Sequence, residues 1–512
     1  MFLRARPVEF EALKPIVVLN KDDAEDIGVK ALDRVELFFN KVRLTAIVNI
    51  SQRMIPMGEV GLYSSVQERL KANFGDKIRV IASETPESLL FIRKKMRGKI
   101  LTNKEIHKII EDVVEQTLSA VEITSFVISL YNHEMTTGEV AALSMAMATT
   151  GRTLRLKNRV IFDKHSIGGV PGDKTSMLLV PTVAAAGLTI PKTSSRSITS
   201  PAGTADRVEC LCPVDLKMNE IRRVVEKTNG CMVWGGGVDL APADDIFIQI
   251  EYPLSIDPML LPSVMSKKKA VNADYIVIDI PTGRAVKIKS IEEAQSLGHR
   301  FIDLGKRLGM TVECVSTFGE QPIGYGIGPA LEAREALQIA QTGRGPEDII
   351  EKVTHLSSVL LDFKNIKNSK QKALDMIRNG KTWKKMKQII AAQGGDPDIK
   401  PEDIELGGKI ISIKSSVSGK VFWVNNNSIA QIAKVAGAPK DKGAGILLHK
   451  KLNDKVRRGE TLFEIFADKR YKLNRALRLS KELNIMGVGK DYEMVLAEIP
   501  EEEEQKYFIL ER

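Results

Sequence analysis

The sequence predicts an α/β protein of several domains, and three observations lead to this prediction. The chain has 512 residues, of which 43% are hydrophobic, so it can bury several cores. A β-rich stretch is followed by helical periodicity and then by strands that alternate with helices, a rhythm typical of a sheet covered by helices. Glycine-rich loops follow two strand-like runs. The expected division is residues 1–85 (a small β-barrel-like domain), 86–158 with parts of 213–270 (helical), 159–400 (central α/β) and 401–512 (C-terminal α+β).

Composition restricts the function and the compartment. The four cysteines show no CxxC spacing, which argues against a zinc site or a disulfide framework. The most apolar run, residues 177–191, is too short to span a bilayer, and the N-terminus has no signal-peptide core, so we expect a cytoplasmic protein without a membrane partner. Only 5% of the residues are aromatic and the net charge of +10 is spread among many acids, so a phosphorylated small molecule explains the basic bias better than nucleic acid does.

For the N-terminal part of the chain, the sequence predicts a group of strands followed by a group of helices. Apolar β-branched runs predict the strands, and residues 83–86 form a polar linker. Thr102 and Thr136 each stand three residues before a glutamate, which predicts capping boxes at two helix starts. The predicted strands are residues 16–19, 35–39, 44–50 and 78–81, and the predicted helices are residues 89–96, 103–118, 120–132, 137–150, 213–229 and 256–270.

For the second half of the chain, the sequence predicts a sheet covered by helices, followed by a β-rich C-terminal part. Residues 394–397 (GGDP) mark a break between these parts. The predicted strands are residues 275–279 and 311–316, with β-like sequence at 404–424, and the predicted helices are residues 291–308, 329–341, 347–363 and 369–379.

A candidate anion site lies near the middle of the chain. A strand-like run at residues 160–162, a glycine loop at 165–173 and a helical pattern at 175–186 follow one another. Glycines let the backbone approach a ligand, and a helix start presents free N–H groups to an anion. A P-loop is rejected because Asp173 stands where a glycine should precede the lysine. For this loop alone, an ordinary strand–helix turn stays open.

Two motifs resemble a known enzyme family. Residues 163–173 (DKHSIGGVPGD) and 194–209 (SSRSITSPAGTADRVE) resemble the signatures of the thymidine and pyrimidine-nucleoside phosphorylases, with Pro171 as an extra residue. The resemblance continues through residues 240–244 and 263–268. It implies a helical domain and a mixed α/β domain of the nucleoside phosphorylase II type, with the active site in the cleft between them.

Both ends of the chain carry further resemblances. Residues 419–421 and 454–462 resemble the lipoyl-like C-terminal domain of pyrimidine-nucleoside phosphorylases, although no lipoylation or biotinylation motif is present. Residues 17–35 resemble the repeat of double-psi β-barrels, which implies docking, oligomerisation or a lid, with simple stabilisation as the alternative.

The family resemblance also implies residue roles. Inorganic phosphate is the co-substrate, and no metal or other cofactor is expected. We expect Lys164 to bring its charge from a solvent-accessible loop, and His165 to face the base and the sugar. Ser263 and Lys267 are one helical turn apart, so both face the cleft. The implied phosphate-binding residues are Lys164, Ser166, Gly168, Ser176, Ser194 and Thr204.

The base side departs from the family pattern. Pyrimidine phosphorylases use an arginine after the Pro-Ala-Asp element to hold a pyrimidine carbonyl, but no arginine occurs between Arg223 and Arg284, and residues 250–251 take its place. Asp257 matches a family acid, and burial there would let its carboxyl protonate the leaving base, so Asp257 is the expected catalytic residue. An N-cap, with Pro258 at the first helical position, is the alternative interpretation.

Chain length, the N-terminal domain, the GGVPGD loop and the missing arginine together resemble one branch of the family, the archaeal AMP phosphorylases. The implied reaction, in nucleotide salvage or degradation, converts AMP and phosphate into adenine and ribose 1,5-bisphosphate, with CMP and UMP as further substrates, in a homodimer or larger homo-oligomer. The implied nucleotide-binding residues are Gly169, Ser195, Arg196, Ser197, Ile198, Thr199, Ser200, Thr204, Ser263, Lys287, His165 and Lys267. A structural Arg196, an ordinary pyrimidine-nucleoside phosphorylase and an anthranilate-phosphoribosyltransferase-like enzyme remain alternatives.

Overall fold

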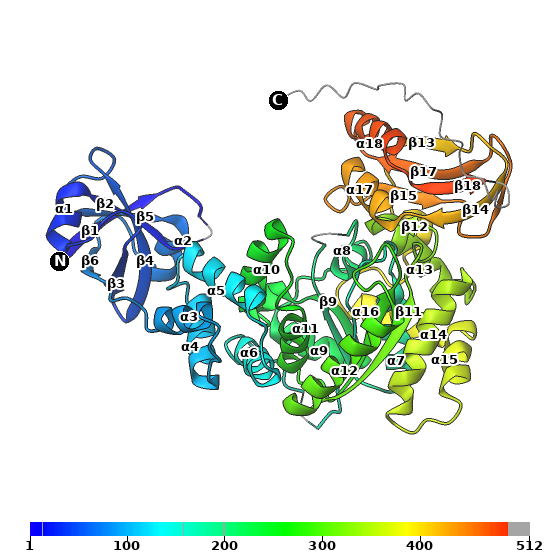
Figure 1. Ribbon diagram of the computed structural model, residues 1–512, viewed down its shortest axis with the longest axis horizontal. Helices are drawn as coiled ribbons and strands as arrows, with labels where there is room; N and C mark the ends of the chain where they lie inside the picture. Colours follow the sequence, from blue (N-terminus) through cyan, green and yellow to red (C-terminus); the bar gives the residue numbers. More distant parts are fainter. Residues whose placement is uncertain (13, 157, 198–199, 490–512) are drawn as a thin grey trace, which may run out of the picture.

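The computed structural model describes residues 1–12, 14–156, 158–197 and 200–489. A β-barrel lies at one end, a group of helices connects it to an α/β body, and a second β-rich part packs on the far side of that body (Figure 1). Within the described residues, no helix is both long enough and apolar enough to cross a bilayer.

The N-terminal barrel closes in the strand order β1-β5-β2-β4-β3-β6. The four predicted strands are present, but the sequence does not predict β1 and β5, because arginines in β1 and Gly61 in β5 interrupt the apolar pattern. Closure buries alternate residues of β1, Leu3 and Ala5, in a core that belongs to the barrel alone. The double-psi topology stays a prediction. The elements are β1 (Phe2–Val8), β2 (Ile16–Asn20), α1 (Lys21–Ile27), β3 (Arg34–Phe39), β4 (Val42–Ser51), β5 (Glu59–Tyr63), α2 (Ser64–Leu70) and β6 (Lys77–Ala82).

Helices α3 to α6 follow, and both predicted capping boxes are confirmed. The Thr102 and Thr136 side chains accept from the backbone of Glu105 and Glu139, and each glutamate accepts in return from the threonine N–H. Helix α10 returns from later in the chain to pack on this group, with Phe247 beside Phe126. The helices are α3 (Ser88–Met96), α4 (Asn103–Val114), α5 (Ala120–Asn132), α6 (Thr137–Thr149) and α10 (Pro242–Leu254).

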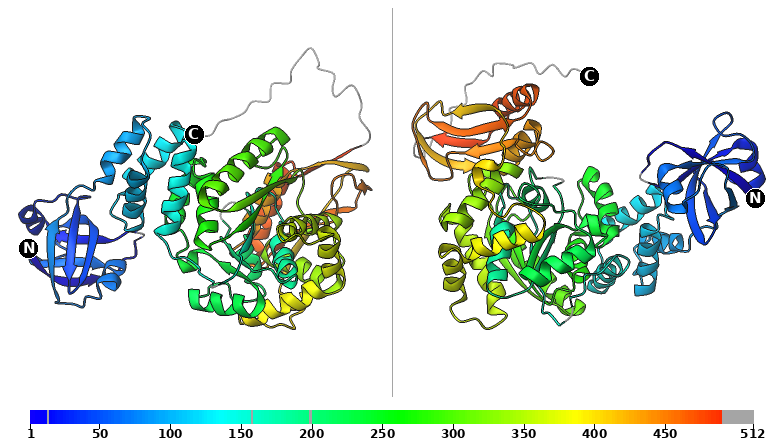
Figure 2. Two further views of the ribbon diagram at one scale, coloured as in Figure 1. Left: turned by 90° about the horizontal axis from the view of Figure 1, so that it is seen from below. Right: turned by 180° about the vertical axis from the view of Figure 1, so that it is seen from behind.

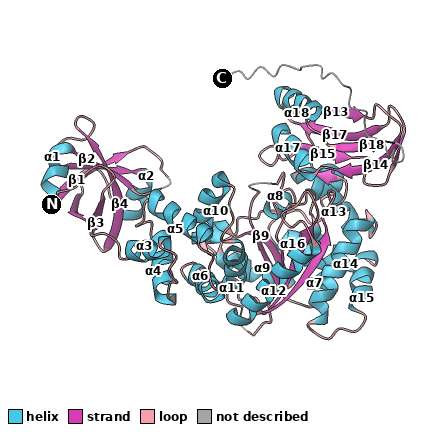
Figure 3. Ribbon diagram, in the orientation of Figure 1, coloured by secondary structure: helices cyan, strands magenta, loops and turns pink. Residues whose placement is uncertain are grey.

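The α/β body contains two parallel strand groups, β11-β10-β7 and β8-β9, and a bridge between Ile161 and Thr189 connects them. Because all five strands are parallel, their carboxyl ends share one edge, where ligands of such sheets bind. Val277 belongs to the core that contains α14, and Ile276 and Ile278 belong to the core that contains α12. Figure 3 shows the helices that surround the strands of this body. The strands are β7 (Phe162–Ser166), β8 (Ile190–Ser194), β9 (Gly230–Trp234), β10 (Tyr275–Thr282) and β11 (Thr311–Phe318).

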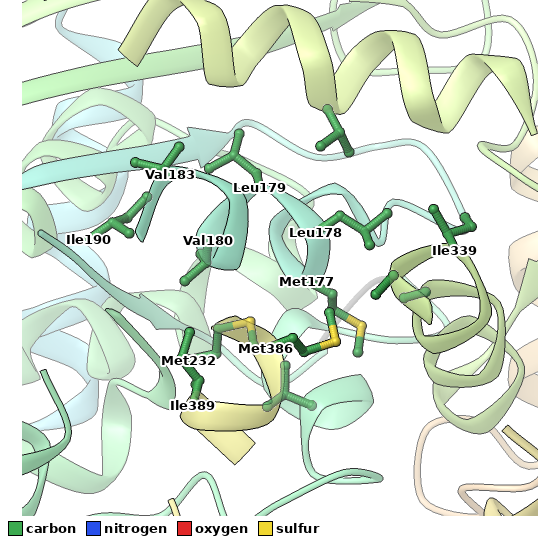
Figure 4. Packing of buried hydrophobic residues seen from close by; sticks show 14 of the residues in the cluster. Met177, Leu178, Leu179, Val180, Val183, Ile190, Met232, Ile339, Met386 and Ile389 are labelled. Carbon is green, nitrogen blue, oxygen red and sulfur yellow. The ribbon is translucent and has the colours of Figure 1, made fainter. Parts of the chain in front are cut away.

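Helix α7 lies at the centre of this body and is apolar on every side, as expected of a fully buried helix (Figure 4). Met177 and Leu178 point toward different neighbours, and Met386 of α16 packs nearby. This packing fixes the helix start that follows the glycine loop. The helices of the body are α7 (Thr175–Ala185), α8 (Thr204–Val208), α9 (Met218–Thr228), α11 (Leu260–Ala270), α12 (Ile291–Leu308), α13 (Pro329–Thr342), α14 (Glu347–Asp362), α15 (Ser369–Arg378) and α16 (Lys381–Ala392), with 3-10 turns η1 (Gly236–Val238) and η2 (Pro401–Asp403).

The C-terminal part contains the sheets β12-β15-β17-β13 and β16-β14-β18. Strand β12 comes from the α/β body, so the two parts share a sheet. The predicted β-rich stretch is confirmed as β13 and β14, whereas the lipoyl-like description stays a prediction. The elements are β12 (Gly326–Ile327), β13 (Lys409–Lys414), β14 (Gly419–Val424), α17 (Asn426–Ala436), β15 (Gly445–Leu448), β16 (Lys455–Val456), β17 (Thr461–Ala467), α18 (Arg470–Glu482) and β18 (Met486–Gly489).

Polar contacts join the barrel to the helices, and Figure 2 shows the barrel standing away from the α/β body. Arg34 of β3 donates to the Thr117 carbonyl and pairs with Glu122 of α5, and the Lys14 ammonium lies 3.4 Å from the Leu118 carbonyl. The barrel therefore combines an independent core with a polar junction.

Removal of residues 1–84 should leave the rest of the chain folded, because the barrel core includes none of the later residues. We expect a cooperative thermal transition by circular dichroism, with a changed assembly size by light scattering. Loss of a cooperative transition in the truncated chain would contradict the independence of the two parts.

Candidate active site

The first motif starts on a strand and not in a loop. Strand β7 runs from Phe162 through Ser166, so the predicted strand at residues 160–162 is placed too early. Lys164 and His165, predicted in a loop, are strand residues; Ser166 ends β7 and lies opposite Asp279 of β10. The reason is that charged side chains on β7 are buried in ion pairs, which a reading of apolar runs cannot detect.

Lys164 belongs to a buried ionic network. Its ammonium lies 3.6 Å from the Asp279 carboxylate and 3.7 Å from that of Asp173, and its side chain is only 2% exposed. The predicted solvent-accessible position is therefore wrong. Lys352 of α14 completes the network at 2.8 Å from Asp279, and Thr317 donates to the same carboxylate at 2.6 Å.

The network keeps Asp173 ionised at the end of the glycine loop. Burial alone would raise the pKa of Asp173, but the ammonium groups of Lys164 and Lys352 hold it far below its usual range. Burial would lower the pKa of Lys352, and Asp173 and Asp279 raise it instead. The Lys164 ammonium is thus held in place by two carboxylates and partly neutralised by them.

Asp163 organises the opposite face of β7. Lys268 of α11 lies 2.6 Å from its carboxylate and Lys192 of β8 lies 4.0 Å away, while Lys192 donates to the Lys164 carbonyl at 2.7 Å. These contacts connect β7 to the strand that leads into the second motif.

His165 is a neutral imidazole in this environment. Desolvation lowers its pKa well below the usual value, and the positive charges nearby lower it further. The four contributing cations are Lys268, Lys192, Lys267 and Lys164. The ring can therefore donate or accept a hydrogen bond, but it brings no charge to a substrate.

The glycine loop uses conformations that other residues adopt poorly. Gly168 and Gly169 have φ angles of 81° and 100°, and a Cβ at Gly169 would lie 3.4 Å from the backbone nitrogen of Lys287. The loop therefore touches the segment that carries Lys287. The Gly168 N–H donates to the Ser166 hydroxyl at 3.4 Å, and Ser176 is buried in the first turn of α7.

Lys174 points away from this loop. Its ammonium donates to the carbonyls of Ile323 and Gly326 at 3.1 and 3.0 Å and pairs with Glu335. It holds the β12 segment in place and is fully buried. Unlike the lysine of a P-loop, it therefore cannot contact a nucleotide phosphate.

The second motif follows β8. Ser194 ends that strand, and Thr204 opens α8 after Gly203. The Asp206 carboxylate accepts from the N–H groups of Ser197 and Gly203 at 2.7 and 2.8 Å, which closes the loop on itself. Of the predicted residues here, Ser195 is exposed and Ser197 and Ser200 are half-buried, whereas Ile198 and Thr199 lie outside the described residues.

Arg207 joins the two motifs and was not singled out by the sequence. Its guanidinium donates to the carbonyls of Asp173 and Ala202, one in each loop, and pairs with Glu332 at 3.0 Å. Its position within the second motif is the one signal that could have identified it.

Arg196 is engaged within the protein. Both of its terminal nitrogens donate to Glu209, at 2.9 and 2.6 Å, and its guanidinium lies over the Trp234 ring. Lys442 of the C-terminal part also pairs with Glu209 at 3.0 Å. Arg196 and Lys442 together hold the pKa of Glu209 at about 2.

The part of the site that is predicted to face the base contains two ion pairs. Lys267 pairs with Asp244 of the Pro-Ala-Asp element, and Ser263 lies half-buried one turn earlier on α11. The Lys287 ammonium lies 2.7 Å from the Asp257 carboxylate.

The expected setting of Asp257 is wrong in two respects. Helix α11 begins at Leu260 with Met259 at the cap position, so Asp257 is not an N-cap and Pro258 is not the first helical residue. The Asp257 side chain is also 41% exposed, so the burial on which its role as an acid was made conditional is absent. The buried carboxyl nearby is Glu251, at the end of α10.

Cavity size does not identify this site. A cavity of about 880 Å³ is lined by residues of the barrel and of α4, among them Glu36, Arg43 and Lys108, and contains none of the predicted residues. A smaller cavity of about 470 Å³, beside Val140 and His299, contains none of them either. Among the described residues, no group of three or more histidine, cysteine or acidic side chains is placed to hold a metal ion. The site is defined by its loops and ion pairs.

Comparison with known proteins agrees with this arrangement. Residues 90–151 match the helical bundle domain of a glycosyl transferase family, and residues 158–383 match its a/b domain. Residues 421–485 match the pyrimidine nucleoside phosphorylase C-terminal domain. The fold and the site therefore define a glycosyl transferase of the nucleoside phosphorylase type.

Proteins that are similar over nearly the whole chain define the family more closely. An AMP phosphorylase of Thermofilum pendens is 45% identical over 96% of this chain and 96% of its own length. One from Thermococcus kodakarensis is 48% identical over 91% and 93%. This chain belongs to the AMP phosphorylase family. A solved anthranilate phosphoribosyltransferase from Thermus thermophilus, at 17% identity and a TM-score of 0.51 over 59% of this chain and 98% of its own, shares the fold alone.

Lys164→Ala should abolish turnover and, because the side chain is buried, should also destabilise the protein. Asp279 and Asp173 would lose one of their two cations, so we expect the free energy of unfolding to fall by about 3 kcal/mol. Steady-state kinetics and denaturant unfolding measure the two effects. Retention of more than about a tenth of kcat/KM, a loss below ~1.4 kcal/mol, would contradict the assigned role.

Proposed function

We propose that this protein cleaves AMP with inorganic phosphate, giving adenine and ribose 1,5-bisphosphate, with CMP and UMP as further substrates. The observation that carries the proposal is the contact between the glycine loop and the Lys287 segment, because the loop that we propose to bind an anion then lies beside the Lys287–Asp257 pair. The names of the relatives support the same reaction.

Inorganic phosphate would bind at the carboxyl end of β7. Lys164 supplies one positive charge, and the neutral donors there are Ser166, Ser176, Ser194, Thr204 and the backbone of Gly168. Because Asp173 and Asp279 already share the Lys164 charge, the phosphate is held without being strongly neutralised. It therefore remains nucleophilic, and catalysis comes from positioning.

The 5′-phosphate of the nucleotide needs a second anion site. Lys287 is the best placed cation, because its ammonium is half exposed and its partner Asp257 is exposed as well. Gly169, Ser263 and the loop of residues 195–200 would contribute further donors. Arg196 supports this loop through Glu209.

Base departure requires a proton. As the phosphate oxygen bonds to C1′ and the bond from C1′ to the base nitrogen breaks, the electron pair passes to the base. Asp257 would then donate its proton to a ring nitrogen and recover one from solvent. Neutral His165 and Lys267 would hold the base and sugar by hydrogen bonds.

A pyrimidine-nucleoside phosphorylase is the second candidate, favoured by the matched C-terminal domain. The missing arginine argues against it, since Glu251 or Ile250 occupies that place.

We further propose that the domains divide at residues 85, 158 and 400, that the N-terminal barrel is of the double-psi type and that the C-terminal domain is lipoyl-like. We also propose that the protein is a cytoplasmic homo-oligomer and uses no cofactor besides phosphate.

A substrate panel tests the reaction directly. We expect phosphate-dependent release of adenine from AMP and no comparable release from adenosine, uridine or thymidine, measured by separation of the free bases. Base release from uridine or thymidine but not from nucleotides would replace the proposal with the second candidate.

Asp257→Asn should lower kcat by roughly 10²-fold or more, because an amide cannot supply the proton. Its effect on the melting temperature should be small, since Asp257 is exposed and caps no helix. Thermal unfolding and steady-state kinetics with AMP measure both. A variant as active as the parent would show that Asp257 only pairs with Lys287.

A further inference from the structure

The two strands that carry the proposed phosphate-binding residues separate before they reach the site. Strand β7 contains Lys164, and strand β8 ends in Ser194. Just before both strands begin, Ile161 bridges Thr189, and the Phe162 N–H donates to the Thr189 carbonyl at 2.8 Å. Beyond this point β7 pairs with β10 and β8 pairs with β9, and the described residues contain no further main-chain pairing between β7 and β8. The two halves of the site therefore belong to different strand pairs.

Lys192 of β8 spans this separation with its side chain. Its terminal nitrogen donates to the Lys164 carbonyl of β7 at 2.7 Å, and Lys192 stands two residues before Ser194. The N–H of the same residue, Lys164, donates to the Asp163 carboxylate at 2.7 Å. Side chains thus take over, at Lys164, the hydrogen bonding that the main chain of β8 provides at the start of β7.

The contact between Lys192 and β7 depends on a hydrogen-bond donor and not on an ion pair. Lys268 lies 2.6 Å from the Asp163 carboxylate, whereas Lys192 is 4.0 Å away from it. Burial, and then the positive charge of Lys268, lower the pKa of Lys192 well below its usual value. An ammonium and an amine both carry N–H groups, so the bond to the Lys164 carbonyl is available to either form of this buried side chain.

We propose that Lys192 is a positioning residue that sets the distance between the Lys164 side and the Ser194 side of the phosphate site. This inference rests on the proposed function, because it concerns the inorganic phosphate of that reaction. One phosphate ion has to reach donors of both strands at once, so a change in the separation of β7 and β8 weakens its binding and misplaces the attacking oxygen. The 5′-phosphate is proposed to bind at Lys287, in another segment, so its binding depends less on Lys192.

Lys192→Met tests the role by steady-state kinetics, because it keeps the length of the side chain and removes the donor. We expect the KM for phosphate to rise about 10-fold or more, while the KM for AMP changes by less than about 2-fold. Lys192→Gln, which is too short to reach the Lys164 carbonyl, should act in the same way and serves if Lys192→Met does not fold. Lys269→Met removes a comparable bond, 2.8 Å long, to the Leu308 carbonyl outside the site and should leave both constants unchanged. An unchanged KM for phosphate in a folded Lys192 variant would overturn the inference.

A second measurement does not depend on activity. Hydrogen exchange followed by mass spectrometry reports local opening of the main chain. In Lys192→Met, residues 162–166 and 190–194 should both exchange faster, by roughly 5-fold, because the strands lose the hydrogen bond between them. Lys269→Met should leave both segments unchanged, and so would a Lys192 that acted through its charge alone. Unchanged exchange of the two strands in Lys192→Met would overturn the inference, whereas absence of base release from AMP by the parent would refute only the proposed function.

Discussion

The charges buried on strand β7 are the constraint on which the rest of the site depends. Asp163 and Lys164 point to opposite faces of an interior strand, and a buried charge is tolerated only when it is paired. Lys268 neutralises one face, and Asp279 with Asp173 neutralises the other. Because Asp173 ends the glycine loop and the partners of Asp163 lie on β8 and α11, the same pairs fix the glycine loop, the strand that leads into the second motif and helix α11.

The sequence predicts most where local signals are strong. Helix α12 has a clear apolar period and begins and ends where expected, and the capping boxes at Thr102 and Thr136 depend on residues three apart. Strand β7 could not be predicted in the same way. Its charged residues look exposed until their partners are known, and Lys268 is 105 residues from Asp163 in the chain.

For the site, motif matching located the loops but not the environment of their side chains. It named Asp257 and Lys287 without revealing that they pair, and it suggested burial for a carboxyl that is exposed. It noted Glu251 only as the replacement for an absent arginine. Where pyrimidine phosphorylases carry an arginine, this chain has the buried carboxyl of Glu251, which accepts a hydrogen bond from the Met259 N–H two residues after Asp257.

Glu209 links the C-terminal part to the loop that carries Arg196. One carboxylate pairs with Arg196 of the loop after β8 and with Lys442 of the C-terminal part, and β12 joins the α/β body and the C-terminal part in a common sheet. Because the two cations share one counter-charge, the C-terminal domain cannot be exchanged freely. A replacement domain without Lys442 would leave Glu209 with Arg196 alone and so change the electrostatic potential around Arg196. The loop that carries Arg196 and the C-terminal part are therefore electrostatically interdependent, and an exchange of either has to preserve the pairing at Glu209.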